Sequence, residues 1–423
     1  MTAAAIGLCI ALAATGCAGG SDGSGGSSDG RVALTLWTNA MEGPGAQYWK
    51  DAAKEYRSLH PNVTIKIQSV QNEDFDGKLQ TALNSNSAPD IFLQRGGGKM
   101  QAMVDAGQIQ ALDLTDADKA NVGATALEGV SIDGRVYAMP LDTQPEGIYY
   151  SKDLFKKAGI TSTPTTMDEL KDAVAKLKAI EVAPIAVGAK DAWPAAHWYY
   201  NLALRECSQD TMMEAAESLE FDDACWTKAG EDLASLLEVD PFQKGFLTAS
   251  SQQGAGSSAG MLANHKAAME LMGNWNPGVI ANLTPDKKPL PDLGWFPFPA
   301  VPGGQGDPTA IMGGGGGYSL SKNAPKEALG FLRFVVTKEQ QEAYAEAFDT
   351  IPVNKDAQGV VTESYNISAL QAFNKAAYSM QFLDTVYGQN VGNAMNIAVV
   401  NLMAGKGSAA DIVEDVKAAA EKG

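Results

Sequence analysis

The sequence predicts an α/β protein in which a helix-covered parallel sheet is followed by a second unit and a helical end. Residues 32–93 alternate apolar segments rich in β-forming residues with amphipathic segments, in the order β-α-β-α-β. This order is typical of a parallel sheet, because each strand returns to the sheet through a helix. The chain has 423 residues, which is enough for two or three domains.

The first unit is expected to gather polar loops at one edge of its sheet. The patterns predict strands at residues 32–38, 63–67 and 89–93 and helices at residues 47–59 and 74–84. In such sheets ligands bind beyond the carboxyl ends of the strands. The loops at residues 39–42, 71–72 and 94–96 are therefore candidates for a binding site.

The middle of the chain contains a segment that resembles a crossing between domains. Residues 141–155 run extended, are interrupted by polar residues and Pro145, and resume as a strand. Beyond it we expect a helix at 166–180 with a capping box, a strand at 184–187, an aromatic-rich helix opening near 193 and an extended segment at 295–299. Helices are expected at 325–336, 338–347, 367–380, 394–403 and 408–422, with an extended link at 351–354.

Residues 266–278, KAAMELMGNWNPG, are the strongest candidate for a ligand contact. The pattern predicts that a helix rich in Ala and Met runs into a short strand at Met269–Met272 and then breaks, presenting Trp275 on a polar turn. An indole ring offers a flat apolar surface and one N–H donor, which suits the C–H face and hydroxyl rim of a sugar. The alternative is that Trp275 is a core residue following a strand.

The composition excludes some classes of partner. Apolar residues make up 45% of the chain and charged residues 19%, as in a soluble globular protein. The 32 basic and 50 acidic residues give a net charge of −18, which repels nucleic acid and anionic lipid. The three histidines do not have the spacing of metal ligands, and we expect no cofactor and no metal.

The first thirty residues predict export and a lipid anchor. Residues 3–14 are apolar but too short to span a membrane, and Ala14-Thr15-Gly16-Cys17 resembles the bacterial lipobox. The resemblance implies a signal peptide at 1–16, lipidation of Cys17 and a Gly/Ser-rich tether at 17–30, which would hold the protein on the extracellular face of the cell membrane. No Lys or Arg precedes the apolar run, so either the start lies upstream or Cys17 follows an unrelated apolar leader.

In an exported domain, Cys207 and Cys225 form an even pair that predicts a disulfide. Their spacing is not that of a zinc site. The fourth cysteine, Cys9, lies within the apolar leader.

Several motifs in order resemble extracellular solute-binding proteins of family 1, the sugar receptors of ABC importers. They are LTLWT at 34–38, DGRVYAMPLDTQPEGIYYSKDLF at 133–155, KAAMELMGNWNPG at 266–278 and IPVNKDA at 351–357. The resemblance covers the mature chain and implies a two-lobed clamp of type II, like the periplasmic binding proteins, with discontinuous lobes and a central sheet in each. It places residues 31–142 and 316–352 in the first lobe and residues 143–315 and 353–423 in the second, with crossings near 142–144, 313–316 and Pro352. It also implies a monomer that docks on the transmembrane permease subunits of an importer and touches the membrane only through its anchor.

The resemblance implies that a neutral oligosaccharide is held between the lobes. The residues carried over as ligand contacts are Asn39, Glu42, Gln94, Arg95, Asp142, Gln144, Trp193, Trp198, Trp275 and the backbones of Gly314 and Gly315. Carboxylates and Arg can hold adjacent hydroxyls with paired hydrogen bonds, and Trp faces bury the C–H surface. Trp37 is predicted to be core, Trp193 beside Pro194 could pack within its lobe, and Asp142 could bond backbone at the crossing.

Other functions remain open on the sequence. An exported glycosidase or lyase would need two carboxylates about the scissile bond, and a receptor for iron could use Tyr149-Tyr150 or Tyr199-Tyr200. An adhesin is a third alternative. The abundance of aromatic residues favours a sugar receptor, and the branch that the chain resembles favours xylobiose or a related β-linked oligosaccharide of plant cell walls.

Overall fold

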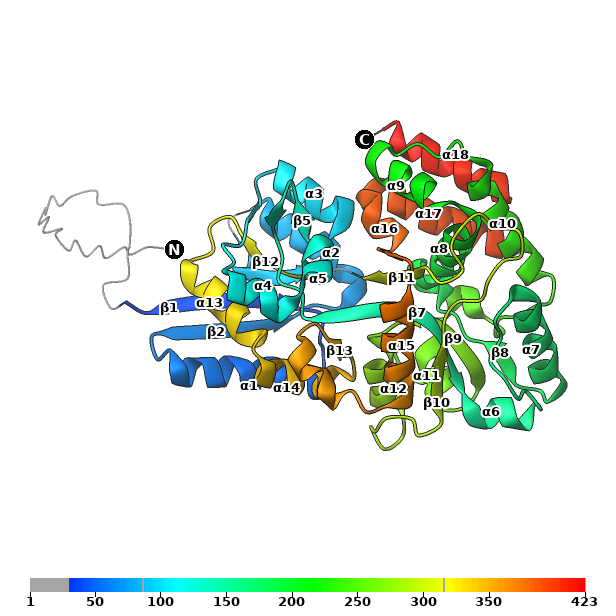
Figure 1. Cartoon of the computed structure of the whole chain (residues 1–423), viewed down its shortest axis with the longest axis horizontal. Coiled ribbons are helices and arrows are strands. Elements are labelled where there is room, and N and C mark those ends of the chain that lie inside the picture. The colour runs from blue at the N-terminus through cyan, green and yellow to red at the C-terminus, as the bar shows by residue number, and fades with distance from the viewer. Residues whose placement is uncertain (1–29, 86, 315, 423) are drawn as a thin grey trace, which may run out of the picture.

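The computed structural model describes residues 30–85, 87–314 and 316–422, which form two α/β lobes side by side (Figure 1). The predicted signal peptide, Cys17, the tether before Gly30, and Gly315 lie outside the described residues. Among the helices of the described residues, none is long and apolar enough to cross a membrane.

The first lobe is built on a five-stranded sheet of order β2-β1-β3-β12-β4. Its strands are β1 (Val32–Thr38), β2 (Val63–Ser69), β3 (Ile91–Gln94), β4 (Ile109–Gln110) and β12 (Gly317–Ser321), of which β1, β2 and β3 are parallel. Its helices are α1 (Gly43–Leu59), α2 (Asn72–Leu83), α3 (Gly97–Asp105), α4 (Asp116–Val122), α5 (Ala124–Glu128), α13 (Lys326–Val335) and α14 (Lys338–Phe348). The hairpin of β5 (Ser131–Ile132) and β6 (Arg135–Val136) lies beside them.

Alternation of apolar residues explains the first strands. Leu34 and Leu36 of β1 are 1% and 0% exposed, whereas the intervening residues point to the opposite face. α1 begins at Gly43 rather than at residue 47, because Pro44 is tolerated in the first turn of a helix. The predicted β-α-β-α-β order and parallel pairing are confirmed.

The second lobe contains a seven-stranded sheet in which β14, β11, β7, β9 and β8 follow one another and β10 and β13 also pair with β7. Its strands are β7 (Asp142–Ser151), β8 (Ala183–Ile185), β9 (Ala267–Gly273), β10 (Leu293–Phe296), β11 (Ile311–Gly314), β13 (Ile351–Pro352) and β14 (Ser379–Met380). The helices of this part of the chain are α6 (Lys152–Lys157), α7 (Met167–Ala179), η1 (Ala189–Asp191), α8 (Trp193–Glu206), α9 (Gln209–Ser218), α10 (Ala224–Leu237), η2 (Phe246–Thr248), α11 (Ser258–Ala263), α12 (Asn276–Leu283), η3 (Lys355–Val360), α15 (Ser364–Lys375), α16 (Leu383–Val386), α17 (Gly388–Met403) and α18 (Ala409–Ala420).

Three predicted elements differ from the structure. The segment expected to begin as a helix before Met269 is entirely strand β9, because it is buried between β7 and β8 and local helix propensity yields to that pairing. Pro277-Gly278, read as a turn, lies in the first turn of α12. The helix expected at 367–380 ends at Lys375, and Ser379–Met380 form β14 beside β11.

Strand β7 runs from one lobe to the other. At its start Asp142 and Thr143 pair with β13, and Gln144 and Pro145 pair with β11. Its second half pairs with β9 and β10 inside the second lobe. Three segments of chain therefore pass side by side between the lobes, as the central part of Figure 1 shows.

Separate hydrophobic cores underlie the two lobes. One contains Leu34, Leu36, Phe92, Phe331 and Leu332 from the two ends of the first-lobe segments. The second lobe has a large core around α8, α10 and α17 and a smaller one around Tyr149 and Trp295. Segments distant in sequence thus share each core, which makes the lobes discontinuous.

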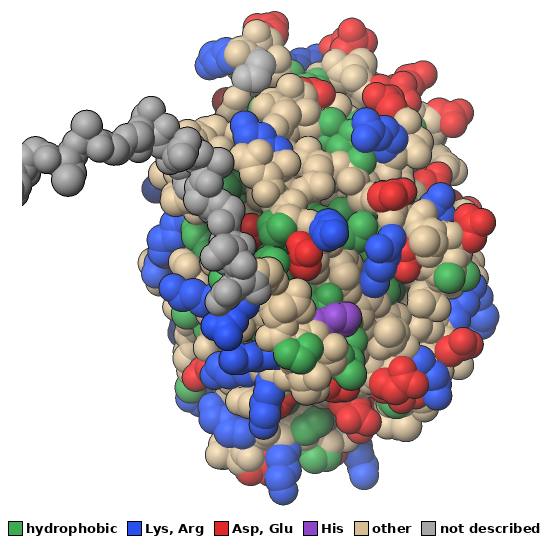
Figure 2. Space-filling view, turned by 90° about the vertical axis from the view of Figure 1, so that its left-hand side faces the viewer, with side chains coloured by type: hydrophobic (Ala, Val, Ile, Leu, Met, Phe, Trp, Pro, Cys, Tyr) green, Lys and Arg blue, Asp and Glu red, His purple; other side chains and the backbone are tan. Residues whose placement is uncertain are grey.

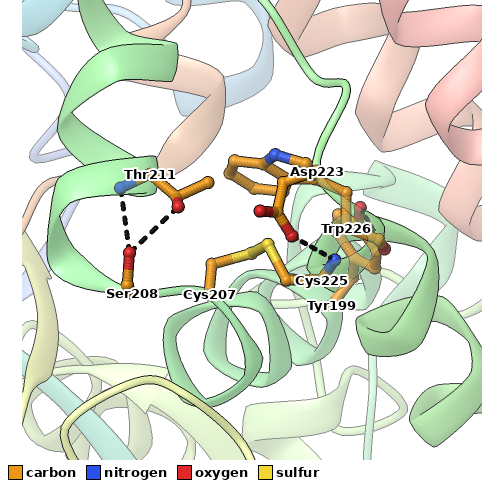
Figure 3. Close-up of a disulfide and its surroundings, with 7 residues drawn as sticks. All are labelled: Tyr199, Cys207, Ser208, Thr211, Asp223, Cys225 and Trp226. Atoms are coloured by element: carbon orange, nitrogen blue, oxygen red, sulfur yellow. Dashed lines mark hydrogen bonds between the residues drawn. A yellow bond between two sulfur atoms is a disulfide. The ribbon is translucent and has the colours of Figure 1, made fainter.

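A disulfide joins Cys207, at the end of α8, to Cys225 in the first turn of α10 (Figure 3). Both cysteines are buried, and Trp226 lies beside them. The flanking helices begin with caps, in which the Ser208 hydroxyl accepts from the Thr211 N–H and the Asp223 carboxylate from the Cys225 N–H. The predicted pairing is therefore present in the structure.

The surface carries charges of both signs. Figure 2 shows the end of the molecule formed by the first lobe, where Lys and Arg side chains gather toward the lower left, Asp and Glu lie mainly toward the right and top, and hydrophobic side chains form only small patches. The chain as a whole has a net charge of −18.

Candidate functional site

Four aromatic side chains of the second lobe form a continuous group, which we call the aromatic cluster: Trp193, His197, Trp275 and Phe382. The ring centroids of Trp193 and Trp275 are 6.1 Å apart, and those of Trp275 and Phe382 are 5.5 Å apart. His197 stacks on Phe382 at 4.6 Å and lies 5.0 Å from Trp193. Both tryptophans remain partly exposed, so the cluster presents ring surface outward.

The motif around Trp275 fixes the position of its ring. Gly273 ends β9, and a Cβ atom there would lie 2.1 Å from the Trp275 ring, so only glycine allows the indole to lie against the strand. Asn274 is fully buried and its amide donates to Tyr149 and Asn366. Its carbonyl oxygen accepts from the backbone N–H of Ile351 in the crossing strand β13. Trp275 is therefore anchored to the connection between the lobes.

Among the residues that the structure describes, none accepts a hydrogen bond from the indole N–H of Trp193 or of Trp275. Four core tryptophans share this feature. The two in the aromatic cluster differ because part of each ring is exposed, although the indole nitrogen itself is buried as in the other four. The exposed part of each ring is apolar surface on which a ligand can pack.

A buried network of hydrogen bonds holds His197 of the aromatic cluster in position. His197 Nδ1 hydrogen-bonds to the Glu146 carboxylate, whose second oxygen accepts from Asn201 at 2.6 Å. His197 and Glu146 are 2% and 1% exposed. Because Glu146 lies on β7, this network ties the orientation of α8 to the strand that crosses between the lobes.

The first lobe contributes a second group, the polar array, at the carboxyl ends of its parallel strands: Asn39, Asn72, Asp76, Arg95 and Lys99. The Asn72 side-chain oxygen accepts from Asn39 at 3.2 Å and from Arg95 at 2.9 Å. Arg95 and Lys99 each donate to Asp76 at 3.1 Å. Burial alone would raise the pKa of Asp76, but these two cations lower it to about 2. The array is pre-oriented and offers several donors and acceptors.

The junction of β11 and β12 contains Gly313, Gly314, Gly316 and Gly317, which we call the glycine run. The aromatic cluster lies on one side of this run and the polar array on the other. A Cβ at Gly316 would lie 2.4 Å from the Gln94 carbonyl oxygen, at the end of β3. A Cβ at Gly314 would lie 2.7 Å from the Gln144 side chain and 3.4 Å from Phe382. Burial raises the pKa of Glu73, at the start of α2, and so does the charge of Asp191 from the second lobe. The two groups therefore lie in different lobes on either side of the crossing segments, and we call the region between them the cleft.

The predicted contacts divide into those that reach this cleft and those that do not. Asn39 and Arg95 belong to the polar array, and Trp193, Trp275, Gln144 and Gly314 lie at or beside the aromatic cluster. Glu42 is exposed before α1 and makes no side-chain cap there. Gln94 is buried, and its side-chain oxygen accepts from the N–H groups of Arg95 and Gly96, so it shapes its own loop.

Asp142 lies at the crossing rather than among the aromatic rings. Its carboxylate accepts from Gln144, Tyr344 and Thr350. Desolvation raises the pKa of Asp142 to about 6, and these donors only partly oppose that rise. The sequence left open that Asp142 hydrogen-bonds to backbone groups at the crossing, whereas in the structure its carboxylate accepts from three side chains.

Trp198 is a core residue in this structure. It is 0% exposed, and its ring packs edge-on against Phe242 and Phe298. On a helix, positions four apart share a face while adjacent positions do not. Trp193 and His197 therefore face the cleft together, and Trp198 is turned into the lobe. We leave Trp198 out of the candidate site.

Sequence reasoning missed His197 and Phe382, and it chose the loop that contains Asn72 without naming Asn72 as a ligand contact. His197 could have been predicted, because it lies four positions after Trp193 and so shares its face of the helix. Asn72 opens α2 in one of the loops already singled out. Phe382 had no local signal, since it precedes the short helix α16 and reaches Trp275 only through folding of the second lobe.

The adjacent tyrosines considered as iron ligands have other partners. The hydroxyls of Tyr199 and Tyr200 donate to the Trp226 carbonyl and to Asn396, and both residues are buried. Tyr149 is also buried and accepts from Asn274, whereas Tyr150 packs on Phe155. None of these hydroxyls is placed with the aromatic cluster as a metal ligand, so the geometry does not favour the iron alternative.

A two-lobed α/β clamp with crossing strands and a site between the lobes defines a solute receptor of type II architecture. The model of the bacterial extracellular solute-binding protein family matches residues 41–342, and the chain belongs to that family. It is a family of binding proteins rather than of enzymes. The recognition from sequence motifs and the predicted fold class are thereby confirmed.

Individual relatives are similar over most of the chain. The diacetylchitobiose binding protein DasA of Streptomyces coelicolor is 24% identical over 369 residues, covering 83% of this chain and 80% of the relative. The multiple sugar-binding protein of Streptococcus mutans is 26% identical over 343 residues, covering 78% and 76%. A solved structure from work on xylan utilization by the thermophilic bacterium Caldanaerobius polysaccharolyticus has a TM-score of 0.82 at 27% identity, covering 92% of this chain and 100% of that one.

Proposed function

We propose that this protein is an extracellular receptor that binds a neutral oligosaccharide between its lobes and delivers it to an ABC importer. The observation that carries the proposal is the aromatic cluster, in which two partly exposed indole rings of the second lobe lie across the crossing segments from the polar array of the first. Apolar ring faces beside fixed donors and acceptors match a sugar. Relatives named for diacetylchitobiose and for multiple sugars support the same class of ligand.

The cleft favours a neutral sugar over a uronate. Arg95 and Lys99 are the cations of the polar array, and both are already paired with Asp76. Glu73 and Asp191 add negative charge at the cleft mouth. A ligand carboxylate would therefore find no free cation among these residues and would be repelled by the acidic groups. We propose xylobiose or a related β-linked oligosaccharide of plant cell walls, which a similar structure from work on xylan utilization supports.

We further propose that the lobes close over the ligand by bending at the crossing segments. The boundaries expected from the sequence, residues 31–142 with 316–352 and residues 143–315 with 353–423, place the hinge at β7, the glycine run and β13. Residues at such crossings can absorb backbone rotation while each core moves as a rigid body. A lipid anchor at Cys17, a monomeric state and docking on permease subunits complete the proposal.

A thermal-shift panel on the mature domain tests the proposal directly. The panel contains xylobiose, diacetylchitobiose, raffinose, galacturonate, a peptide mixture and ferric citrate. A ligand at 100 times its Kd adds about 2.7 kcal/mol to stability, which gives a clear rise in Tm. A rise with one neutral sugar series supports the receptor and identifies its ligand. A rise only with peptide or iron would overturn the sugar assignment.

Incubation with the same sugars separates a receptor from an exported glycosidase. A receptor releases each oligosaccharide unchanged, whereas a glycosidase or lyase produces shorter sugars that chromatography detects. Appearance of cleavage products at a rate proportional to protein concentration would overturn the receptor proposal.

A further inference from the structure

A hollow of about 590 Å³ lies beside α2 in the first lobe, outside the set of predicted contacts. We call it the side hollow. Trp37, Ala82 and the outward residues of α2 line it, among them Glu73, Asp74, Gly77, Lys78 and Thr81. It is an open depression in the surface, not an enclosed cavity.

Trp37, which the sequence predicts to be core, is half-buried: it packs against the first-lobe core and also forms an apolar wall of the side hollow. Leu36 and its alternate neighbours face the core, so Trp37 points to the opposite face of the sheet, where α2 covers it only partly. Gly77 leaves room there, because a Cβ atom at that position would meet no atom within 4 Å. The indole therefore retains an open surface.

The rim of the side hollow is polar and has little free positive charge. Lys78 is paired with Asp74 at 2.9 Å, one turn away on α2. Thr81 and Glu73 are exposed and can exchange hydrogen bonds with hydroxyl groups. An aromatic wall with such a rim suits a neutral sugar unit better than an anion or an aliphatic ligand.

One end of the side hollow lies next to the polar array on α2. Glu73 directly follows Asn72 of the polar array, at the end of α2 that faces the second lobe. Asp191 of the second lobe is close enough to Glu73 to influence its ionisation. An oligosaccharide held at the polar array would thus extend along α2 toward Trp37.

We propose that the side hollow is an outer subsite, in which Trp37 stacks on a distal unit of a neutral oligosaccharide longer than the cleft itself holds. The proposal rests on the sugar-receptor function proposed above and extends it to chain-length preference. The Trp37 subsite adds affinity for the longer chain and leaves a disaccharide in the cleft unaffected.

Calorimetric titration with xylobiose and xylotetraose, and in parallel with diacetylchitobiose and its tetrasaccharide, tests the subsite. We expect the parent to bind the tetrasaccharide of the preferred series at least ten-fold more tightly than the disaccharide. Trp37→Ala should remove that ten-fold gain, and Trp37→Phe should keep part of it. Disaccharide affinity should change less than two-fold in either variant.

A second variant avoids any effect on the sheet. Gly77→Leu fills the side hollow from an exposed helix position, where leucine is also the better helix former, and should remove the tetrasaccharide gain alone. Gly359→Leu, at another exposed glycine with open space around it, is the matched control and should bind as the parent does.

The outcomes separate this subsite from the function on which it rests. Equal affinity of the parent for both chain lengths, or equal losses for both in Trp37→Ala and Gly77→Leu, would overturn the subsite and leave the receptor intact. Failure of the parent to bind either series at any length would overturn the sugar receptor and the subsite together.

Discussion

At the scale of single residues, Trp275 has the clearest expected effect on binding. We predict that Trp275→Ala weakens sugar binding by about 2 kcal/mol, the size of effect found for buried aromatic anchors. Trp275→Phe should lose less, because a ring remains on the Gly273 surface. Calorimetric titration of the preferred disaccharide measures both, and thermal melts control for folding. Unchanged affinity in a folded Trp275→Ala protein would remove this ring from the proposed site.

Glu270 gives a pH-dependent prediction. It is 1% exposed, and its buried carboxyl has a pKa raised by desolvation from 4.5 to about 7. The raised pKa means that the folded state favours the protonated carboxyl. The contribution of Glu270 to the free energy of unfolding is therefore fully present below pH 4.5, and it is lost as the pH rises from there through 7. The change amounts to about 3 kcal/mol at 1.36 kcal/mol per pKa unit.

Glu270→Gln should remove this contribution. The amide keeps an oxygen that can accept from Asn276, now without a charge that must be buried at high pH. Urea unfolding from pH 4 to pH 8 measures the difference in the free energy of unfolding between parent and variant. Burial also raises the pKa of Asp142 and of Asp349 to about 6, but both residues are present in both proteins, so their pH-dependent contributions cancel in this difference. We expect the variant to gain stability over the parent as pH rises. A constant difference across that range would contradict the assignment.

At the scale of elements, the disulfide holds α8 to α10. The cysteines are 18 positions apart, and closing a loop of that size stabilises a fold by about 3 kcal/mol. We predict that Cys207→Ser lowers the stability of the oxidised protein by that order and lowers its Tm. The parent in a thiol reductant should behave like the variant. If the oxidised parent and the variant unfold together, the bond contributes nothing to stability.

Asn274 shows how one buried amide can join several elements. It accepts from Thr350 and Ile351 at β13 and donates to Tyr149 of β7 and Asn366 of α15. The polar residues flanking Trp275 therefore serve the architecture, while the indole between them faces the cleft. The two asparagines of this turn are polar because their side chains make buried hydrogen bonds, not because the turn is exposed to solvent.

At the scale of the whole molecule, the lobes also meet away from the crossings. α3 of the first lobe approaches α16 closely, since a Cβ at Gly98 would lie 2.6 Å from the Val386 carbonyl oxygen. We predict that Gly98→Ala holds the lobes apart and weakens sugar binding several-fold without unfolding either core. Small-angle scattering of the sugar-saturated protein should give a larger radius than for the parent.

Gly359→Ala is the control for Gly98→Ala, because its added methyl group meets open space. It should leave both affinity and radius as in the parent. Parent-like values for Gly98→Ala would show that the contact between α3 and α16 does not limit closure.

Short local patterns in the sequence were sufficient to predict many of the strands and helices of this protein and part of its candidate site. Alternation gave β1 and the parallel order of the first sheet, helical spacing gave α7 and α13, and the polar interruption around Pro145 marked the crossing strand β7. These succeed because apolar periodicity and breaker residues act within a few positions. Trp275, Trp193, Asn39 and Arg95 could be chosen for the candidate site because they follow strands or open helices at one edge.

Tertiary structure alone decided the rest. Strand β9 replaced an expected helix because burial between two strands outweighs propensity, and Trp198 turned inward because the core occupies that face of α8. Phe382 joined Trp275 across more than a hundred residues of chain, and Trp37 became the wall of a hollow because Gly77 of α2 leaves space above it. Contacts between distant segments depend on how cores pack, and no local pattern encodes which side chain is left facing the cleft.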